Sequence, residues 1–208
     1  MPVNLLEGAQ ALGVSLDPEQ SDQLLAFAEL IRKWNAKVNL VSRQDIERLE
    51  NRHLLDSLAA APYLNEGTHL DIGSGAGLPG VVLAVVRPEY KFLLCERMAR
   101  RCRFLQTVVQ TLGLKNVEVV EASIESIRDR NFDGVTARAV AKPNVIWDWV
   151  SHLLADSGSV INFLSTQSGA GEPIDDLGYD IPCKVTYHRY ELPGIDQAHT
   201  LMKMEHKT

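Results

Sequence analysis

The sequence lacks a hydrophobic segment that is long enough to cross a membrane. Its longest apolar stretch, from Leu78 to Val86, is interrupted by Pro79 and Gly80 and is far shorter than the roughly 20 residues that a spanning helix needs. The first four residues, Met-Pro-Val-Asn, lack the basic start and the apolar core of a secretory signal. We therefore expect a cytoplasmic protein with no membrane contact.

Cysteine is scarce in this chain. Only Cys95, Cys102 and Cys183 are present, and they form no CxxC pair and no spacing typical of metal ligands. The sequence therefore predicts buried or inert thiols, with no disulfide framework and no metal site.

Positive charge is also in short supply, since the net charge is −6. A protein that binds nucleic acid through its whole surface needs clustered Lys and Arg, and the composition argues against this class. One segment differs, because residues 87–103 hold six basic side chains against Glu89 and Glu96. The basic ones are Arg87, Lys91, Arg97, Arg100, Arg101 and Arg103. A local basic patch is therefore predicted within an acidic chain.

The first 65 residues have the pattern of helices. Asp17 is placed as an N-cap, Pro18 stands at the first helical position, and Gln20 can close a capping box. Apolar residues then recur at three- and four-residue spacing, which predicts one buried helical face: Leu24, Phe27, Ala28, Ile31 and Trp34. A second helix is expected from about Asp45 to Leu58. We therefore predict a helical cap over residues 1–65.

From residue 66 onward, short apolar runs alternate with amphipathic segments, which is typical of βαβ units. Strands are expected at 69–72, 91–95, 117–120, 134–137 and 159–164, with helices between them. Two further strands, 184–191 and 200–204, flank a Pro-Gly turn. The predicted fold is a doubly wound, Rossmann-like α/β domain over residues 66–208, with a mostly parallel seven-stranded sheet and a C-terminal antiparallel hairpin.

A glycine-rich loop follows the first predicted strand. Gly73, Gly75 and Gly77 alternate with other residues, so that the backbone can turn tightly and a ligand can approach it without meeting a Cβ atom. The spacing of Gly75, Gly77 and Gly80, with Glu96 about 20 residues later, also satisfies the dinucleotide pattern. The pattern alone leaves both kinds of cofactor open.

Two residues favour S-adenosylmethionine over a dinucleotide. Pro79 removes an N–H donor where the following helix begins, which suits a pyrophosphate poorly. Asp71 places a carboxylate beside the loop, which suits a cofactor with an ammonium and a sulfonium. Glu96 could then accept hydrogen bonds from both ribose hydroxyls. The structural alternative is that Asp71 and Glu96 only cap turns.

The next two strand ends complete the predicted site. Ile124 could cover an adenine ring while Glu125 or nearby backbone groups meet its edge, although Glu125 could equally be a solvated acid at a helix start. Arg138 places a cation at the mouth of the cleft, or else forms a structural ion pair. No nucleophilic cysteine and no amino-methyltransferase box stand at this point. No residue at this point is an obvious general base for catalysis. This absence fits methylation of guanine N7, which accepts a methyl group without losing a proton.

At these residues the chain resembles the bacterial 16S ribosomal RNA guanine-N7 methyltransferase family, also called glucose-inhibited division protein B. The similar segments are Lys33-Trp34-Asn35, Asn39-Leu40, the run from His53 to Leu58, Leu78-Pro79-Gly80, Arg87-Pro88, Phe132-Asp133-Gly134 and Arg138-Ala139. The resemblance implies that Gly73, Leu78, Ile124, Glu125 and Arg138 contact S-adenosylmethionine. It also implies that His53 and Asp56 lie near the active-site mouth, where we expect a structural pair and no catalytic residue.

The chain departs from the family in two places. Leu164 is followed by Ser165 and Thr166, where the family has Lys and Gly, and an acidic stretch runs from Glu172 to Asp180. Ala198 stands before His199 where the family has Arg. These departures leave open whether activity is weakened or lost.

The resemblance implies 16S ribosomal RNA or the small ribosomal subunit as partner, bound by a monomer. We expect the RNA contact on the basic part of the helical cap and on the helical segment that carries Arg97, Arg100, Arg101 and Arg103, of which the first three share one side. A solvated helix face is the alternative. A small-molecule methyltransferase, a ribosome-docking module that holds the cofactor without turnover, and a nicotinamide oxidoreductase remain the competing functions.

Overall fold

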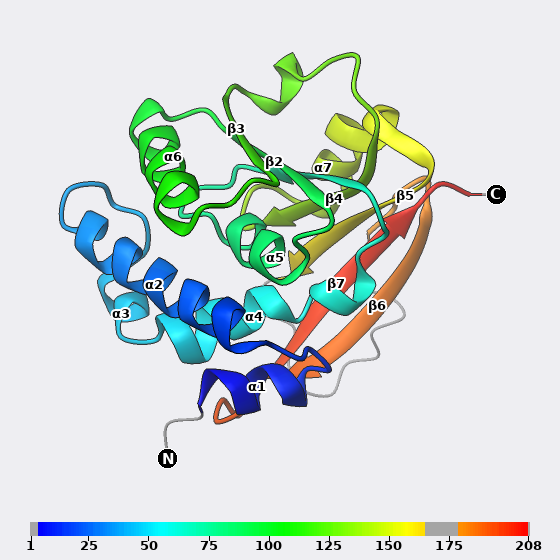
Figure 1. Cartoon of the computed structure of the whole chain (residues 1–208). Helices are drawn as coiled ribbons and strands as arrows, with labels where there is room; N and C mark the ends of the chain where they lie inside the picture. Colours follow the sequence, from blue (N-terminus) through cyan, green and yellow to red (C-terminus); the bar gives the residue numbers. More distant parts are fainter. Residues whose placement is uncertain (1–3, 165–178, 208) are drawn as a thin grey trace.

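The protein is built around one seven-stranded sheet (Figure 1). A computed structural model describes residues 4–164 and 179–207, so that Ser165 and most of the acidic stretch lie outside the described residues. The strand order is β3-β2-β1-β4-β5-β7-β6, and β7 runs antiparallel to both of its neighbours. The strands are β1 (Thr68–Ile72), β2 (Lys91–Glu96), β3 (Val117–Glu121), β4 (Phe132–Arg138), β5 (Leu154–Leu164), β6 (Lys184–Glu191) and β7 (Ala198–Glu205). The predicted fold class is confirmed.

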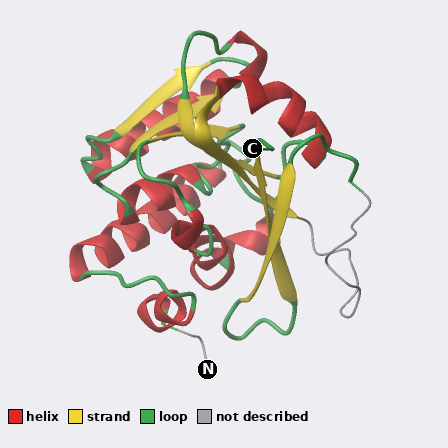
Figure 2. Ribbon diagram, turned by 90° about the vertical axis from the view of Figure 1, so that its right-hand side faces the viewer, coloured by secondary structure: helices red, strands yellow, loops and turns green. Residues whose placement is uncertain are grey.

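Helices cover both faces of the sheet (Figure 2). Helices α5 (Gly80–Val86) and α6 (Ala99–Leu112) lie on one face, together with the N-terminal helices. Helix α7 (Pro143–Val150) packs on the other face, where its apolar residues join a buried cluster that includes Ile72, Val135 and Val160. The connections that contain α5, α6 and α7 thus bury apolar helix faces against the sheet, whereas the connection from β3 to β4 holds only a short 3-10 helix. No helix of the described residues is long and apolar enough to span a membrane.

Helix α2 (Pro18–Asn35) begins as its sequence predicts. The Asp17 carboxylate accepts from the backbone N–H of Gln20 at 2.8 Å, and the Gln20 side chain accepts from the N–H of Asp17 at 3.1 Å. Of the predicted apolar face, all members except Trp34 are buried, and the half-buried Trp34 ring lies 5.7 Å from that of Phe104 in α6. The capping box and the apolar stripe together orient α2 across α5 and α6, after the short helix α1 (Leu5–Ala11).

The second N-terminal helix differs from its prediction. Residues 43–58 form α3 (Arg43–Ile46), a π-helix (Leu49–Leu54) and α4 (Leu55–Leu58) in place of one helix from Asp45 to Leu58. The π-helix brings Leu49 and Leu54, five residues apart, into the same buried cluster. Such turns are rare and gather at functional sites, and amphipathic spacing gives no signal for them.

Strand β5 begins five residues before its predicted start. Its first half contains the exposed Asp156 and Ser157, and its register against β4 shifts between Phe132 and Gly134. Because these residues carry no apolar run, apolar patterning does not predict them as part of a strand. The hairpin strand β6 has its predicted bounds, and β7 extends two residues beyond the prediction at its start and one at its end. Short 3-10 helices lie at Ala61–Tyr63, Ile124–Ser126 and Ser151–Leu153.

Candidate active site at the strand switch

A cleft of about 300 Å³ opens at the carboxyl ends of β1, β2 and β4. The strand order reverses between β1 and β4, which is where open α/β sheets bind ligands. Its walls come from the strand ends, from the loop before α6 and from α7. They are Ile72, Gly73, Cys95, Glu96, Arg97, Met98, Arg101, Ala122, Ser123, Ile124, Glu125, Ala139, Val140 and Trp149.

The glycines of the loop after β1 serve different purposes. The φ angles of these glycines are +62° at Gly73, +55° at Gly75 and +82° at Gly77. Residues that have a Cβ atom rarely adopt this region of backbone conformation. Gly73 lines the cleft. Gly77 is buried, and a Cβ there would lie 2.6 Å from the Val81 side chain and 3.2 Å from the ring of Phe27. Gly77 therefore allows α2 and α5 to pack closely, and it does not line the cleft.

Glu96 ends β2 on the wall of the cleft and is 3% exposed. Its Oε2 accepts from the backbone N–H of Gly75 at 3.0 Å, and its Oε1 accepts from that of Met98 at 2.8 Å. These two bonds fix the carboxylate between the glycine loop and the start of α6. Each oxygen keeps a further lone pair, so Glu96 can still accept from ligand hydroxyls.

Asp71 does not line this cleft, which differs from the direct ligand contact that we expected. Its Oδ1 accepts from the Thr136 hydroxyl at 2.8 Å, and its Oδ2 accepts from the Gly80 N–H at 3.3 Å. Burial raises the pKa of Asp71 to about 6. The reason lies in strand alternation, since Asp71 points to the sheet face under α5 while Ile72 points to the opposite face. Asp71 thus caps α5 and joins β1 to β4.

The other predicted cofactor residues divide in the same way. Ile124 and Glu125 line the cleft beside Gly73 and Glu96, and Gly75 holds Glu96 through its amide. Leu78 is 6% exposed and packs in the apolar core. Its side chain therefore stabilises the start of α5 and forms no part of the cleft wall.

Arg138 turns away from the cleft to the N-terminal helices. Its Nη1 donates to Oδ2 of Asp56 at 3.1 Å, in an ion pair whose side chains are 17% and 15% exposed. The hydroxyl of Tyr190 donates to the other Asp56 oxygen, and Nδ1 of His199 lies 3.5 Å from it. The ion-pair alternative for Arg138 is thus the arrangement observed. We call Asp56, Arg138, Tyr190 and His199 the Asp56 cluster.

Burial determines the protonation of this cluster. Burial, and then the Asp56 charge, raise the pKa of Tyr190 above its usual value, so this phenol stays protonated and can donate. Burial also lowers the pKa of His199. His53, from the same signature as Asp56, lies 3.1 Å from Asp45, and burial followed by the charge of Arg138 lowers its pKa. The histidines are therefore neutral at neutral pH.

Several wall residues were not predicted. Met98, which is 47% exposed, and Trp149 of α7 flank the cleft from different elements. The sequence signal for Met98 is its position two residues after Glu96. Trp149 has no comparable signal, because an aromatic residue in an amphipathic helix usually indicates core packing. The contact of Tyr190 with Asp56, outside the cleft wall, was not predicted either, because the two residues are 134 positions apart in the chain.

The predicted basic face is only partly a helix face. Arg97 precedes α6, while Arg100 and Arg103 are exposed on it. Arg101 differs from them because it is half-buried. Its Nη2 donates to the backbone oxygen of Asn39 at 3.3 Å, and its Nη1 lies 3.9 Å from Oε2 of Glu96. Arg101 turns toward the cleft, so it does not share the solvent-facing side that we expected for Arg97, Arg100 and Arg101.

Within residues 4–164 and 179–207, no group of three or more His, Cys, Asp or Glu side chains is placed to share a metal ion. Cys95, Cys102 and Cys183 are buried free thiols, as predicted.

A protein-family model described as rRNA small subunit methyltransferase G, or GidB, matches residues 20–170. The chain belongs to this family. The ribosomal RNA small subunit methyltransferases G of Shewanella amazonensis and Neisseria meningitidis are 36% and 38% identical to it over 196 residues, which cover 92% of this chain and 92% of each relative. The predicted relationship to the rRNA small subunit methyltransferase G family is confirmed.

Solved structures agree on the fold. A SAM-dependent methyltransferase from Aquifex aeolicus superposes with a TM-score of 0.57 at 17% sequence identity, over 85% of this chain and 97% of that one. The chain therefore has the Rossmann-like methyltransferase fold that its alternation of strands and helices predicts.

Proposed function

We propose that the protein transfers a methyl group from S-adenosylmethionine to N7 of a guanine in bacterial 16S ribosomal RNA. The observation that carries this proposal is the position of Glu96. In a member of the rRNA small subunit methyltransferase G family, its buried carboxylate is held by the glycine loop on the wall of a cleft at the strand switch. A fixed acceptor at a strand end suits the ribose of a nucleoside cofactor.

The walls of the cleft fit S-adenosylmethionine. Ile124 and Met98 offer apolar surface to an adenine ring, and Glu125 stands exposed beside Ile124. Gly73 is exposed on the cleft wall and has no side chain that would screen its backbone from a ligand. When bound, S-adenosylmethionine supplies a methyl group on a positively charged sulfur. Four further predicted residues do not line the cleft but fix the position of the glycine loop, α5 and β4. They are Asp71, Gly77, Leu78 and Arg138.

The protonation of the cleft fits an acceptor that needs no base. Burial, and then the Glu96 charge, raise the pKa of the Cys95 thiol to about 11, so it stays protonated and is a poor nucleophile. Guanine N7 has an in-plane lone pair and loses no proton on methylation. Alignment of acceptor and donor is therefore the main contribution that this chain needs to make.

The arginines at the rim supply phosphate contacts. Arg97 lies on the cleft wall, and Arg100 and Arg103 are exposed on the adjoining α6. Cationic side chains at the edge of a methyl-transfer cleft suit a polyanionic substrate. We propose that the enzyme acts in the cytoplasm as a monomer on 16S ribosomal RNA or the small subunit.

The test is a methylation assay with labelled S-adenosylmethionine. The substrates are 16S ribosomal RNA, free and in small subunits, from cells that lack the gene. We expect label in the RNA at 7-methylguanosine, located by chemical cleavage at that base, and less label at a limiting cofactor concentration when Glu96→Ala replaces the wild type. Label in small metabolites only, or S-adenosylmethionine binding without any turnover, would contradict the proposal and favour its competitors.

A further inference from the structure

A second groove, of about 650 Å³, opens beside the cofactor cleft. The end of α2, the loop at residues 36–42 and α3 form its walls, and the start of α6 closes it. Its lining residues are Arg32, Asn35, Ala36, Asn39, Leu40, Val41, Ser42, Arg43, Ile46 and Arg101. Arg101 lines both this groove and the cofactor cleft. The two spaces therefore meet at one side chain, and we call this second space the α2–α3 groove.

The lining of the α2–α3 groove contains three arginines and no carboxylate, in a chain whose net charge is −6. Arg32 is neutralised, since it pairs with Glu29 at 2.7 Å and Glu50 at 2.6 Å. Arg43 is exposed, and no ion pair is found for it among the described residues. Arg43 and Arg101 are thus the cations that the groove presents.

The loop that forms one wall is held by a side chain. Oδ1 of Asn35 accepts from the N–H groups of Leu40 at 2.8 Å and Val41 at 3.0 Å, and its Nδ2 donates to the Val41 oxygen at 3.1 Å. The Arg101 guanidinium donates to the Asn39 oxygen in the same loop. These bonds fix the wall before any ligand arrives, which reduces the ordering that binding requires.

We infer that the α2–α3 groove binds the single-stranded RNA segment that adjoins the target nucleotide. This inference rests on the proposed function. A base that enters a cleft of about 300 Å³ must leave its stack, and its neighbours in the strand must then run over the surface next to that cleft. The α2–α3 groove is continuous with the cleft through Arg101.

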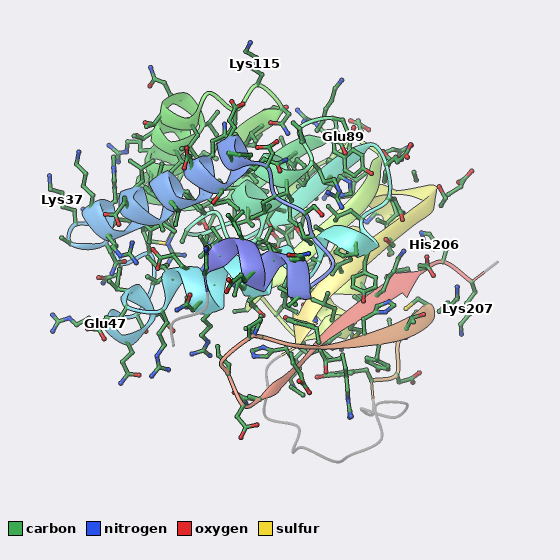
Figure 3. The ribbon with its side chains drawn as sticks, turned by 60° about the horizontal axis from the view of Figure 1, so that its bottom comes forward. Lys37, Glu47, Glu89, Lys115, His206 and Lys207 are labelled. Carbon is green, nitrogen blue, oxygen red and sulfur yellow. The ribbon has the colours of Figure 1, made fainter. Side chains whose placement is uncertain are left out.

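The chemistry of the lining matches that occupant. Arg43 and Arg101 can contact successive phosphates, while Leu40, Val41 and Ile46 offer apolar surface to sugars and bases. In Figure 3, Lys37 and Glu47 lie at this end of the molecule and both project into solvent. The surrounding surface is therefore of mixed charge, and the groove itself is the cationic part.

Charge reversal at Arg43 tests the inference. Arg43→Glu places a carboxylate in the groove, and the change favours folding because position 43 begins α3, where acidic residues are stabilising. Asn39→Asp adds a negative charge of nearly the same shape. Arg48→Glu is the matched control, since Arg48 is exposed five residues later and does not line the groove.

We expect Arg43→Glu to raise the KM for 16S ribosomal RNA by about tenfold or more and to weaken the salt dependence of RNA binding by about one unit of slope. Asn39→Asp should change both in the same direction. The kcat and the affinity for S-adenosylmethionine should stay at wild-type values, and the melting temperature should not fall. Arg48→Glu should change the KM by less than about threefold.

Three results would overturn the inference. An Arg43→Glu enzyme with the KM of the wild type would remove the groove from the RNA path, as would an equal loss in Arg48→Glu. A loss of activity on small subunits with unchanged binding to protein-free RNA would assign the groove to a ribosomal protein. The salt dependence of RNA binding is measured without the cofactor, so it tests the groove even if the wild type fails to methylate RNA. That failure would reject the proposed function.

Discussion

Arg138 at the end of β4 donates a hydrogen bond to Asp56 in the N-terminal helices, and the two residues are 82 positions apart in the chain. Tyr190 of β6 reaches the same carboxylate. One acidic side chain thus joins the N-terminal helices, the central sheet and the C-terminal hairpin. Its partner Arg138 immediately precedes Ala139, which lines the cofactor cleft.

Breaking this pair should be costly. Asp56→Asn or Arg138→Gln leaves the partner charge largely buried without its counterion, so each should lower the free energy of unfolding by about 3 kcal/mol. The double variant should lose clearly less than the sum of the single losses. Urea unfolding of the four proteins measures this coupling, and strictly additive losses would show that the two side chains act independently.

Glu96 should determine cofactor affinity. Glu96→Ala should weaken S-adenosylmethionine binding by about 1–3 kcal/mol, because ligand hydroxyls lose a charged acceptor. Isothermal calorimetry measures this, with the exposed Glu118→Ala as control. An adenosine analogue without ribose hydroxyls should lose less affinity on the variant than on the wild type. Equal losses for both ligands would remove Glu96 from the ribose site.

Alanine substitutions at Gly75 and Gly77 should lower the stability of the protein by different amounts, because the two glycines have different surroundings. Gly75→Ala adds a Cβ whose nearest neighbour is the Gly73 oxygen at 3.6 Å, so only its positive φ is unfavourable, at about 1–2 kcal/mol. Gly77→Ala has the same strain and also meets Val81 at 2.6 Å, which should cost about 1–3 kcal/mol more. Thermal unfolding of both variants checks this order. Equal melting temperatures would be inconsistent with the packing described.

Stability should fall on the acid side because of His69. This ring is fully buried, its Nε2 donates to the Asn65 oxygen at 2.9 Å, and its Nδ1 has no partner among the described residues. Burial lowers its pKa, so the unfolded chain takes up a proton at a higher pH than the folded protein. The free energy of unfolding should therefore be retained above about pH 6.5 and fall below it, by up to about 1.4 kcal/mol per pH unit.

The variant His69→Phe keeps a ring between Tyr90 and Phe92 and removes this titration. Its unfolding free energy should depend less steeply on pH between about pH 5 and 6.5 than that of the wild type. His53 and His199 retain part of the slope, because their pKa values are also lowered by burial. The exposed His152→Ala is the control. An unchanged slope in His69→Phe would show that His69 titrates normally.

Local patterns predicted much of the fold. The capping box of α2, the parallel strands and the bounds of β6 follow from capping residues and apolar periodicity, which depend on neighbours a few positions apart. Glu96 could be placed on the cleft because it ends a buried strand. The inward direction of Asp71 was not predicted, since alternation separates the two faces of a strand without saying which element covers each.

Contacts between distant segments could not be predicted in this way. Nothing in the spacing of the chain relates Tyr190 to Asp56, or Arg101 to the backbone of Asn39, because these contacts depend on how whole elements pack. The π-helix is a further case. The π-helical turn brings Leu49 and Leu54 into the core together. That burial depends on tertiary packing, so local spacing does not predict the turn.

Strand β7 follows β6 in the chain, yet it lies inside the sheet between β5 and β6. During synthesis on the ribosome, β5 and β6 emerge before the strand that must pair with both of them. Their backbone N–H and C=O groups on that side have no sheet partner until residues 198–205 have left the exit tunnel. The seven-stranded sheet is therefore completed only after residues 198–205 have been made, and until then its nascent edges need protection from pairing with other chains.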